Sequence, residues 1–170
     1  MPVYRRLDSP AGPLLAAAST RGLMMLAYRD DHDDDDPPED GDSALLDPVQ
    51  RQLDEYFAGA RREFDLPLDW ALVRGFARAV LEATARIPYG ETRTYSEIAA
   101  EAGSPRAFRA TGNALGSNPI AIVIPCHRVV ASGGRRRSTR RADAARGRAA
   151  PSRRPPAGRR RRGRRGTRAS

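Results

Sequence analysis

The sequence contains no lysine, so all 30 of its basic residues are arginine. It has a single cysteine, Cys126, and only two histidines, His32 and His127. One cysteine excludes an internal disulfide and a zinc site of several thiolates, and two separated histidines do not complete a closed zinc site. We therefore expect no metal and no organic cofactor, and a lone free thiol is typical of a reducing compartment.

Long apolar runs are also absent from the chain. No segment is long enough to span a bilayer, and no basic-then-apolar signal peptide opens the sequence. These absences predict a cytoplasmic protein without a membrane partner. The formal net charge of +9 favours a polyanionic partner, although most of the excess lies in residues 135–170.

Two segments have too few apolar residues to form a core. Residues 30–42, DDHDDDDPPEDGD, combine like charges with two prolines, which predicts a disordered acidic loop over 30–43. A calcium loop needs a glycine at its sixth position and a glutamate at its twelfth, and this segment has neither. Residues 135–170 are mainly Arg, Ala, Gly and Pro, so we expect an Arg-rich disordered tail.

The first 70 residues have the pattern of a small α/β domain. Apolar runs at 3–7 and 13–18 flank a Ser-Pro-Ala-Gly turn and predict a β-hairpin, and residues 22–28 predict a third strand. Residues 47–58 predict a helix, with Asp47 as its N-cap and Pro48 at its first position. We therefore expect an antiparallel sheet and one helix in residues 1–70.

Residues 71–134 have mainly helical patterns. The spacing predicts a helix over 72–86, which the Ile-Pro-Tyr-Gly sequence ends. Thr94 caps a short helix over 95–101, with Glu97 completing a capping box. Ser104 and the proline after it predict the start of another helix that runs to about Leu115. Two helices joined by a glycine-containing turn predict a helix-turn-helix.

The only cysteine follows an apolar run. Residues 120–124 predict a strand that Pro125 terminates, and Cys126, His127 and Arg128 come directly after it. A thiol reacts as its thiolate, which a neighbouring imidazole and guanidinium favour. This sequence fits a nucleophile, but the Cys-His dipeptide by itself favours an inert buried cysteine beside a hydrogen-bonded histidine.

The segment IPCHRVV, residues 124–130, resembles the active-site signature of the O6-alkylguanine-DNA alkyltransferases, also called methylated-DNA–protein-cysteine methyltransferases. The similarity extends through IPYGETRTYSEIAAEAGSPRAFRATGNALGSNPIAIVIPCHRVV, residues 87–130. It continues more loosely through SPAGPLLAAAST and LDEYFAGARREFDLPLD in the N-terminal half. The resemblance implies an α/β fold in which a sheet-and-helix domain precedes a winged-helix domain, residues 71–134, that binds DNA and carries the cysteine.

The resemblance also implies the chemistry. Cys126 takes an alkyl group from O6 of guanine, with O4 of thymine as an alternative target, and no ordinary step regenerates the thiol. His127 matches the base that removes the thiol proton through a water molecule. Tyr95 matches the tyrosine that protonates the departing guanine, and Asn118 matches the residue that ties the helix-turn-helix to the active-site loop. Arg128 supports the same site.

The partner that the resemblance implies is double-stranded DNA carrying O6-alkylguanine, bound by a monomer. The damaged nucleotide is flipped out of the helix, and Arg109 matches the arginine that fills the gap. The second helix enters the minor groove, so small residues such as Ala107 and Ala110 face the DNA, and Thr94 and Ser104 belong to the same interface. Phe108 departs from this pattern, because a small residue is usual there; either it points into the protein or it alters the groove contact.

The resemblance ends after Gly134. Members of the family continue with a loop that covers the alkyl pocket and a helix whose glutamate completes the Cys–water–His network, whereas no glutamate follows Glu101 here. Two interpretations are open for residues 135–170. They form an arginine-rich arm that binds phosphates, or they are an out-of-frame translation of a GC-rich gene, which is the interpretation we favour.

Two other functions are compatible with these residues. A non-catalytic protein that binds DNA damage would keep the helix-turn-helix and Arg109 but would not transfer alkyl groups. A cysteine hydrolase would use Cys126 and His127, although no well-separated histidine supports that arrangement, because His32 lies in the acidic loop. Incubation with alkylated duplex DNA distinguishes the three functions.

Overall fold

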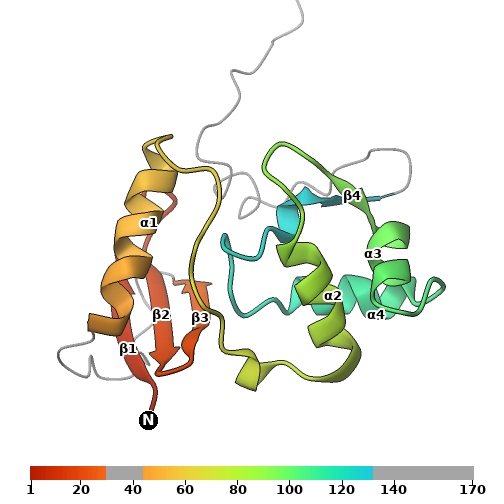
Figure 1. Ribbon diagram of the computed structural model, residues 1–170, viewed down its shortest axis with the longest axis horizontal. Coiled ribbons are helices and arrows are strands. Elements are labelled where there is room, and N and C mark those ends of the chain that lie inside the picture. Colours follow the sequence, from red (N-terminus) through yellow and green to blue (C-terminus); the bar gives the residue numbers. More distant parts are fainter. Residues whose placement is uncertain (30–43, 132–170) are drawn as a thin grey trace, which may run out of the picture.

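The computed structural model describes residues 1–29 and 44–131. The predicted acidic loop and the predicted Arg-rich tail lie outside these residues. The strands β1 (Val3–Leu7), β2 (Leu14–Ser19) and β3 (Gly22–Tyr28) form an antiparallel sheet in the order β1-β2-β3. The hairpin and the third strand that the sequence predicted are therefore confirmed (Figure 1).

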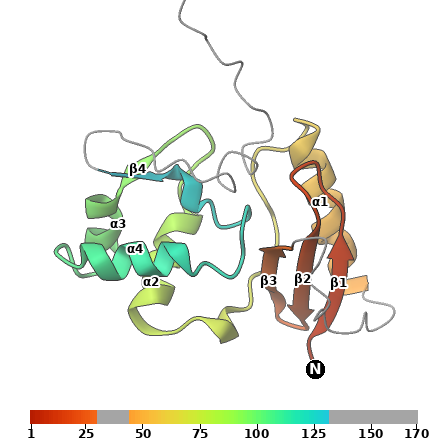
Figure 2. The ribbon, with the colours of Figure 1, turned by 180° about the vertical axis from the view of Figure 1, so that it is seen from behind.

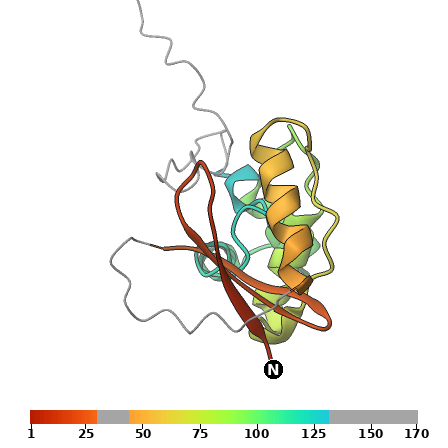
Figure 3. The same ribbon diagram turned by 90° about the vertical axis from the view of Figure 1, so that its left-hand side faces the viewer.

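The helix α1 (Asp47–Phe57) follows the 3-10 turn η1 (Ala44–Leu46) and lies along one face of the sheet (Figure 3). Its inward side chains Val49, Leu53 and Tyr56 are buried. The prediction that Asp47 caps this helix is wrong. Asp47 is the first helical residue, and its carboxylate accepts a hydrogen bond from Arg5 Nη1 at 2.8 Å, so the side chain supports β1 instead of the helix N-terminus.

The second half of the chain is a group of helices beside the sheet (Figures 1 and 2). Its elements are η2 (Trp70–Leu72), α2 (Gly75–Ala85), β4 (Arg93–Thr94), α3 (Tyr95–Glu101), α4 (Phe108–Gly116), η3 (Cys126–Arg128) and β5 (Val129–Val130). The helix α2 contacts both α3 and α4. The short strands β4 and β5 pair in parallel, so the segment after the cysteine returns to the start of α3.

The helix predicted over 72–86 is divided. The Asp69 side chain accepts a hydrogen bond from Ala71 N and starts the short turn η2. The backbone then extends through Val73, which is buried, and α2 begins at Gly75, whose φ is +59°. The hydrophobic periodicity continued across this interruption, so the sequence pattern did not locate it.

The helix-turn-helix consists of α3 and α4. The predicted capping box is present, because Thr94 N donates to Glu97 Oε2 at 2.7 Å and Glu97 N donates to Thr94 Oγ1 at 3.2 Å. The prediction that Ser104 caps the second helix is wrong. The Ser104 carbonyl accepts from Ala107 N in a turn of its own, and α4 starts only at Phe108.

The apolar run 120–124 is not a strand, contrary to the prediction. It is a turn in which Ile124 N donates to the Ile120 carbonyl at 3.1 Å, and Ile122 has a φ of +69°. Only its first residues follow a strand: Leu26 N donates to Pro119 O, and Ala121 N donates to Leu26 O, both at 2.8 Å. The three isoleucines of this run are buried, whereas Ala121 and Val123 are half-buried. The apolar pattern therefore indicated burial and not a strand.

These backbone bonds join the two halves along the edge of β3. A second isolated bridge links Leu23 to Leu68, and a Cβ at Gly22 would collide with the Pro67 carbonyl, so the linker passes very close to the start of β3. The buried apolar side chains of both halves form one continuous cluster. None of the helices in the described ranges is long and apolar enough to cross a membrane.

We expect Asp69 to make the stability of the fold depend on pH. The Ser19 hydroxyl donates to Asp69 Oδ2 at 2.5 Å. This bond, together with the Ala71 amide and Arg21, holds the pKa of the Asp69 carboxyl below its usual value of 3.8. A carboxyl whose pKa is lowered in the folded state stabilises that state above the unfolded pKa, and the stabilisation is lost as the pH falls through the folded value.

The variant Asp69→Asn should therefore unfold at a lower urea concentration than the unsubstituted protein near neutral pH. The difference should shrink as the pH falls below about 3.8, the value of an unperturbed carboxyl. The exposed Asp8→Asn serves as the control. A difference that does not change with pH would contradict this role of the Asp69 charge.

Candidate active site

Cys126 is the first residue of η3, which is one turn of 3-10 helix. Its amide donates to Ile124 O at 2.8 Å, and its carbonyl accepts from Val129 N. The thiol is free and half-buried, and its side chain packs at the margin of the common core. The cysteine therefore has a fixed backbone and a side chain that solvent reaches in part, which differs from the fully buried cysteine of the inert interpretation.

Asn118 fixes the loop that leads to the cysteine. Its Nδ2 donates to Ile124 O at 3.1 Å, and its Oδ1 accepts from Ile120 N at 2.9 Å. One side chain at the end of α4 thus holds both ends of the loop. Ile122 lies within this loop and is buried. Its backbone is in the left-handed region, where β-branched residues are rare and strained. No sequence pattern indicated this strained residue.

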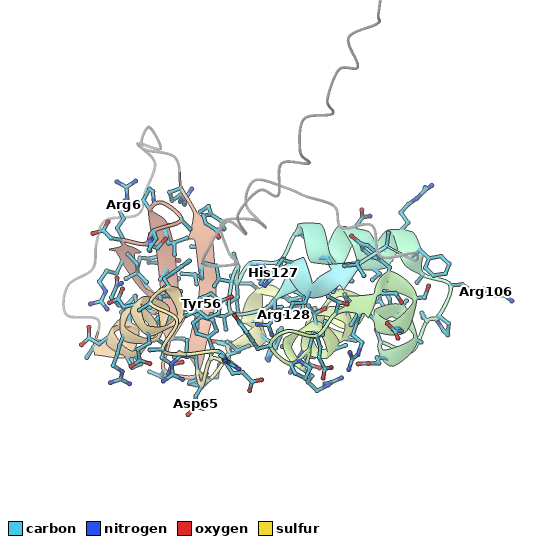
Figure 4. All side chains as sticks on the ribbon, turned by 90° about the horizontal axis from the view of Figure 1, so that it is seen from above. Arg6, Tyr56, Asp65, Arg106, His127 and Arg128 are labelled. Carbon is cyan, nitrogen blue, oxygen red and sulfur yellow. The ribbon has the colours of Figure 1, made fainter. Side chains whose placement is uncertain are left out.

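Arg128 points toward the N-terminal half of the molecule. Its Nη1 donates to the Ile87 carbonyl at 2.7 Å, and its guanidinium carbon lies 5.5 Å from the centre of the Tyr89 ring. It also interacts with the hydroxyl of Tyr56 on α1, which lines the same cavity as Arg128. Figure 4 shows Tyr56, His127 and Arg128 together where α1 faces η3.

The Tyr56 phenol is buried, with only 7% of the residue exposed. Burial raises the pKa of Tyr56 above its usual value of 10.0, and the charge and hydrogen bond of Arg128 act in the opposite direction. The phenol is therefore neutral at physiological pH, and its oxygen is a hydrogen-bond acceptor for the guanidinium. No pattern in the sequence indicated this contact.

A cavity of about 230 Å³ lies beside His127. Its lining is shared by both halves of the protein: Tyr56, Tyr89, Gly90, Glu91, Thr92, His127 and Arg128. Neither Cys126 nor Tyr95 lines it. The cavity therefore lies against the histidine and is distinct from the surface around the sulfur.

Tyr95 is the first residue of α3, and its half-buried side chain packs against the same core as Cys126. It faces α4 at Gly112, where an added Cβ would lie 4.0 Å from Tyr95 Cε1. This distance is an ordinary van der Waals contact, so the ring would also fit against an alanine at this position. Among the described residues, no hydrogen bond joins Tyr95 to Cys126.

The exposed surface of α4 carries the residues expected to meet DNA. Arg109 and Ala110 are exposed, and so is Ser104 in the preceding turn; Ala107 is half-exposed. Within residues 1–29 and 44–131 the Arg109 side chain makes no hydrogen bond or ion pair. The possibility that Phe108 points into the protein is wrong, because 51% of this residue is exposed.

Over residues 1–29 and 44–131, no three His, Cys, Asp or Glu side chains lie close enough together to hold a metal ion.

The fold and the site define a protein of two parts that presents one free cysteine beside a helix-turn-helix. Residues 3–70 match the family model of the 6-O-methylguanine DNA methyltransferase ribonuclease-like domain. Residues 75–150 match the model of the DNA binding domain of 6-O-methylguanine DNA methyltransferase, which extends past Gly134.

Individual relatives agree with the family models. The methylated-DNA–protein-cysteine methyltransferase of Methanosarcina barkeri is 43% identical over 134 residues, which cover 78% of this chain and 84% of the relative. That of Mycobacterium bovis is 45% identical over 135 residues, with 78% and 80% covered. The chain belongs to the methylated-DNA–protein-cysteine methyltransferase family.

Solved structures are similar as well. The crystal structure of the Mycobacterium tuberculosis O6-methylguanine methyltransferase has a TM-score of 0.70 at 38% identity, covering 89% of this chain and 96% of that one. The structure of the M. tuberculosis protein OGT in complex with DNA has a TM-score of 0.68 at 41% identity, covering 81% and 84%. The expected fold class, a sheet-and-helix domain followed by a helical DNA-binding domain, is confirmed.

We expect Asn118→Ala to loosen the cysteine loop. The substitution leaves Ile120 N without its partner and removes one of the two donors to Ile124 O, which keeps the Cys126 amide. A buried polar group without a partner costs about 1–3 kcal/mol. Urea unfolding should show a loss of stability in this range. Asn113→Ala, an exposed position on α4, is the matched control. Equal stability of the two variants would contradict the conclusion that the Asn118 side chain stabilises the cysteine loop.

Proposed function

We propose that this protein repairs DNA by transferring an alkyl group from O6 of guanine to the sulfur of Cys126, once per molecule. The observation that carries the proposal is the half-buried free cysteine, held in a fixed turn directly after a helix-turn-helix, in a chain of this family. The relatives are named as methyltransferases, which favours alkyl transfer over the non-catalytic binder and the hydrolase.

The proposed step is an in-line displacement. A sulfur–carbon bond forms at Cys126 while the bond between the alkyl carbon and O6 breaks, and its electron pair remains on the guanine. The thiol proton passes to His127 through a water molecule, and Tyr95 donates a proton to the departing base. The product is a thioether, so the protein is consumed with its substrate. The placement of Tyr95 at the start of α3 and of His127 directly after Cys126 in η3 supports these roles.

DNA binding is assigned to the helix-turn-helix, and the similarity to a relative in complex with DNA supports this partner. The exposed Arg109 stacks in the gap that the flipped guanine leaves. Ala107 and Ala110 leave room for the groove, Thr94 and Ser104 lie at its edge, and the exposed Phe108 contacts the groove wall. Thr94 already uses its hydroxyl in the capping box, so its contact to DNA is through the remaining surface.

The protein is proposed to act as a monomer in the cytoplasm. One chain carries the cysteine, the histidine, the tyrosine and the arginine that the reaction needs, so no residue of a second copy is required. A single free cysteine is best preserved in a reducing compartment.

Replacement of the nucleophile tests the proposal directly. Cys126→Ala should abolish uptake of labelled alkyl groups while leaving the affinity for duplex DNA nearly unchanged, because phosphate contacts supply most of that affinity. Uptake is measured by the transfer of label to protein, and affinity by fluorescence anisotropy at fixed salt. Covalent transfer to this variant would mean that another residue is the acceptor.

The variant Arg109→Ala tests the flipping role. Extruding a base costs a few kcal/mol, and about 1.4 kcal/mol corresponds to a tenfold change, so transfer from duplex DNA should slow by roughly ten- to a hundredfold. Reaction with free O6-benzylguanine, which needs no flipping, should change little.

Arg106→Ala is the matched control for Arg109, because it removes the same charge from an exposed arginine that points away from the body of the protein (Figure 4). At saturating DNA its transfer rate should equal that of the unsubstituted protein. Equal slowing of Arg109→Ala with duplex DNA and with the free base would place Arg109 in the fold or the pocket instead.

A further inference from the structure

The segment that carries the cysteine is attached to the N-terminal half at two places. The first is the backbone pairing of Leu26 in β3 with Pro119 and Ala121. The second is at Arg128, two residues after the sulfur, where α1 contributes Tyr56. Along the chain, Cys126 and His127 lie between these two attachments.

Arg128 and Cys126 belong to one rigid turn. Arg128 N donates to Pro125 O at 2.9 Å, and Val129 N donates to the Cys126 carbonyl. Because these bonds close a single 3-10 turn, a displacement of Arg128 is transmitted to the cysteine and the histidine.

The guanidinium of Arg128 is held on several sides. It donates to Ile87 O at 2.7 Å and lies 5.5 Å from the centre of the Tyr89 ring. It also lines one cavity with Tyr56, whose hydroxyl it affects through its charge (Figure 4). Ile87 and Tyr89 belong to the same half as the cysteine, whereas Tyr56 comes from α1. The Tyr56 contact is therefore the one through which the N-terminal half acts on this arginine.

The Tyr56 ring is itself fixed. It packs against Phe57, with ring centres 5.6 Å apart, and against Phe64 at 5.0 Å, and only 7% of the residue is exposed. A buried phenol that packing holds in one orientation presents its oxygen at a defined point. Hydrogen bonds between such a point and a planar guanidinium fix orientation as well as distance.

We propose that Tyr56 is a positioning residue for Cys126 and His127, which acts through the guanidinium of Arg128. This inference rests on the proposed function of Cys126 as the alkyl acceptor. It gives the N-terminal half a defined task in the reaction, which is to hold the nucleophile in line with the alkyl carbon.

The test uses Tyr56→Phe, which removes the hydroxyl and keeps the ring in its aromatic environment. The rate of benzyl transfer from saturating free O6-benzylguanine should fall by roughly three- to tenfold, within the range of coupling between neighbouring groups of one network. The half-saturating concentration should stay unchanged. Tyr4→Phe on β1, the strand farthest from the helical half (Figure 1), removes the same hydroxyl elsewhere and should react at the original rate.

Amide hydrogen exchange supplies a readout that needs no alkyl transfer. In Tyr56→Phe the amides of Arg128 and Val129 should exchange several-fold faster, whereas those of β2 and α2 should keep their rates. A purely structural loss would instead accelerate exchange throughout the fold.

A double-mutant cycle decides whether Tyr56 acts through Arg128. In an Arg128→Ala background, Tyr56→Phe should cause no further change in either readout; if Arg128→Ala does not fold, Arg128→Lys replaces it. Unchanged rates in Tyr56→Phe, or the same slowing in both backgrounds, would overturn the proposal. If the unsubstituted protein accepts no benzyl group but the exchange rates follow the cycle, the proposed function fails and the positioning role stands.

Discussion

The structure depends on the contact between the edge of β3 and the segment that leads to the cysteine. Two backbone hydrogen bonds of 2.8 Å, from Leu26 N to Pro119 O and from Ala121 N to Leu26 O, join the small sheet to the helical half. Because these bonds lie seven residues or fewer from Cys126 along the chain, the sheet supports the loop that carries the cysteine. The apolar cluster runs without a break from β2 through this contact to the helices.

A displacement reaction requires its nucleophile in a narrow range of positions, since reacting atoms must meet in line at about 3–3.5 Å. The loop supplies this order in three ways. Asn118 holds the backbone at both ends of the turn, β3 fixes its entry, and Arg128 fixes its exit. The strained backbone of Ile122 is tolerated because these contacts determine it from both sides. The fixed loop also explains how one half of the protein contributes to chemistry that takes place in the other.

Local signals in the sequence predicted much of the fold. The hairpin, the third strand and the Thr94–Glu97 capping box are all short-range patterns, and each is confirmed. The errors arose where tertiary contacts override such patterns: the apolar run 120–124 is a buried turn because Asn118 and Leu26 use its backbone groups. The family motif identified Cys126 and its neighbours, but no local pattern brings Tyr56 to Arg128, because that contact joins positions far apart in the chain.

The central claim is that one cysteine accepts one alkyl group from DNA. The most direct measurement is mass spectrometry of the full chain, and then of its tryptic peptides, after incubation with excess duplex DNA containing isotope-labelled O6-methylguanine. The claim predicts one labelled methyl group per protein molecule, located on the peptide that contains Cys126, with the matching guanine restored in the DNA. Label that remains in the DNA, that appears on another residue, or that is released over repeated turnovers would contradict it.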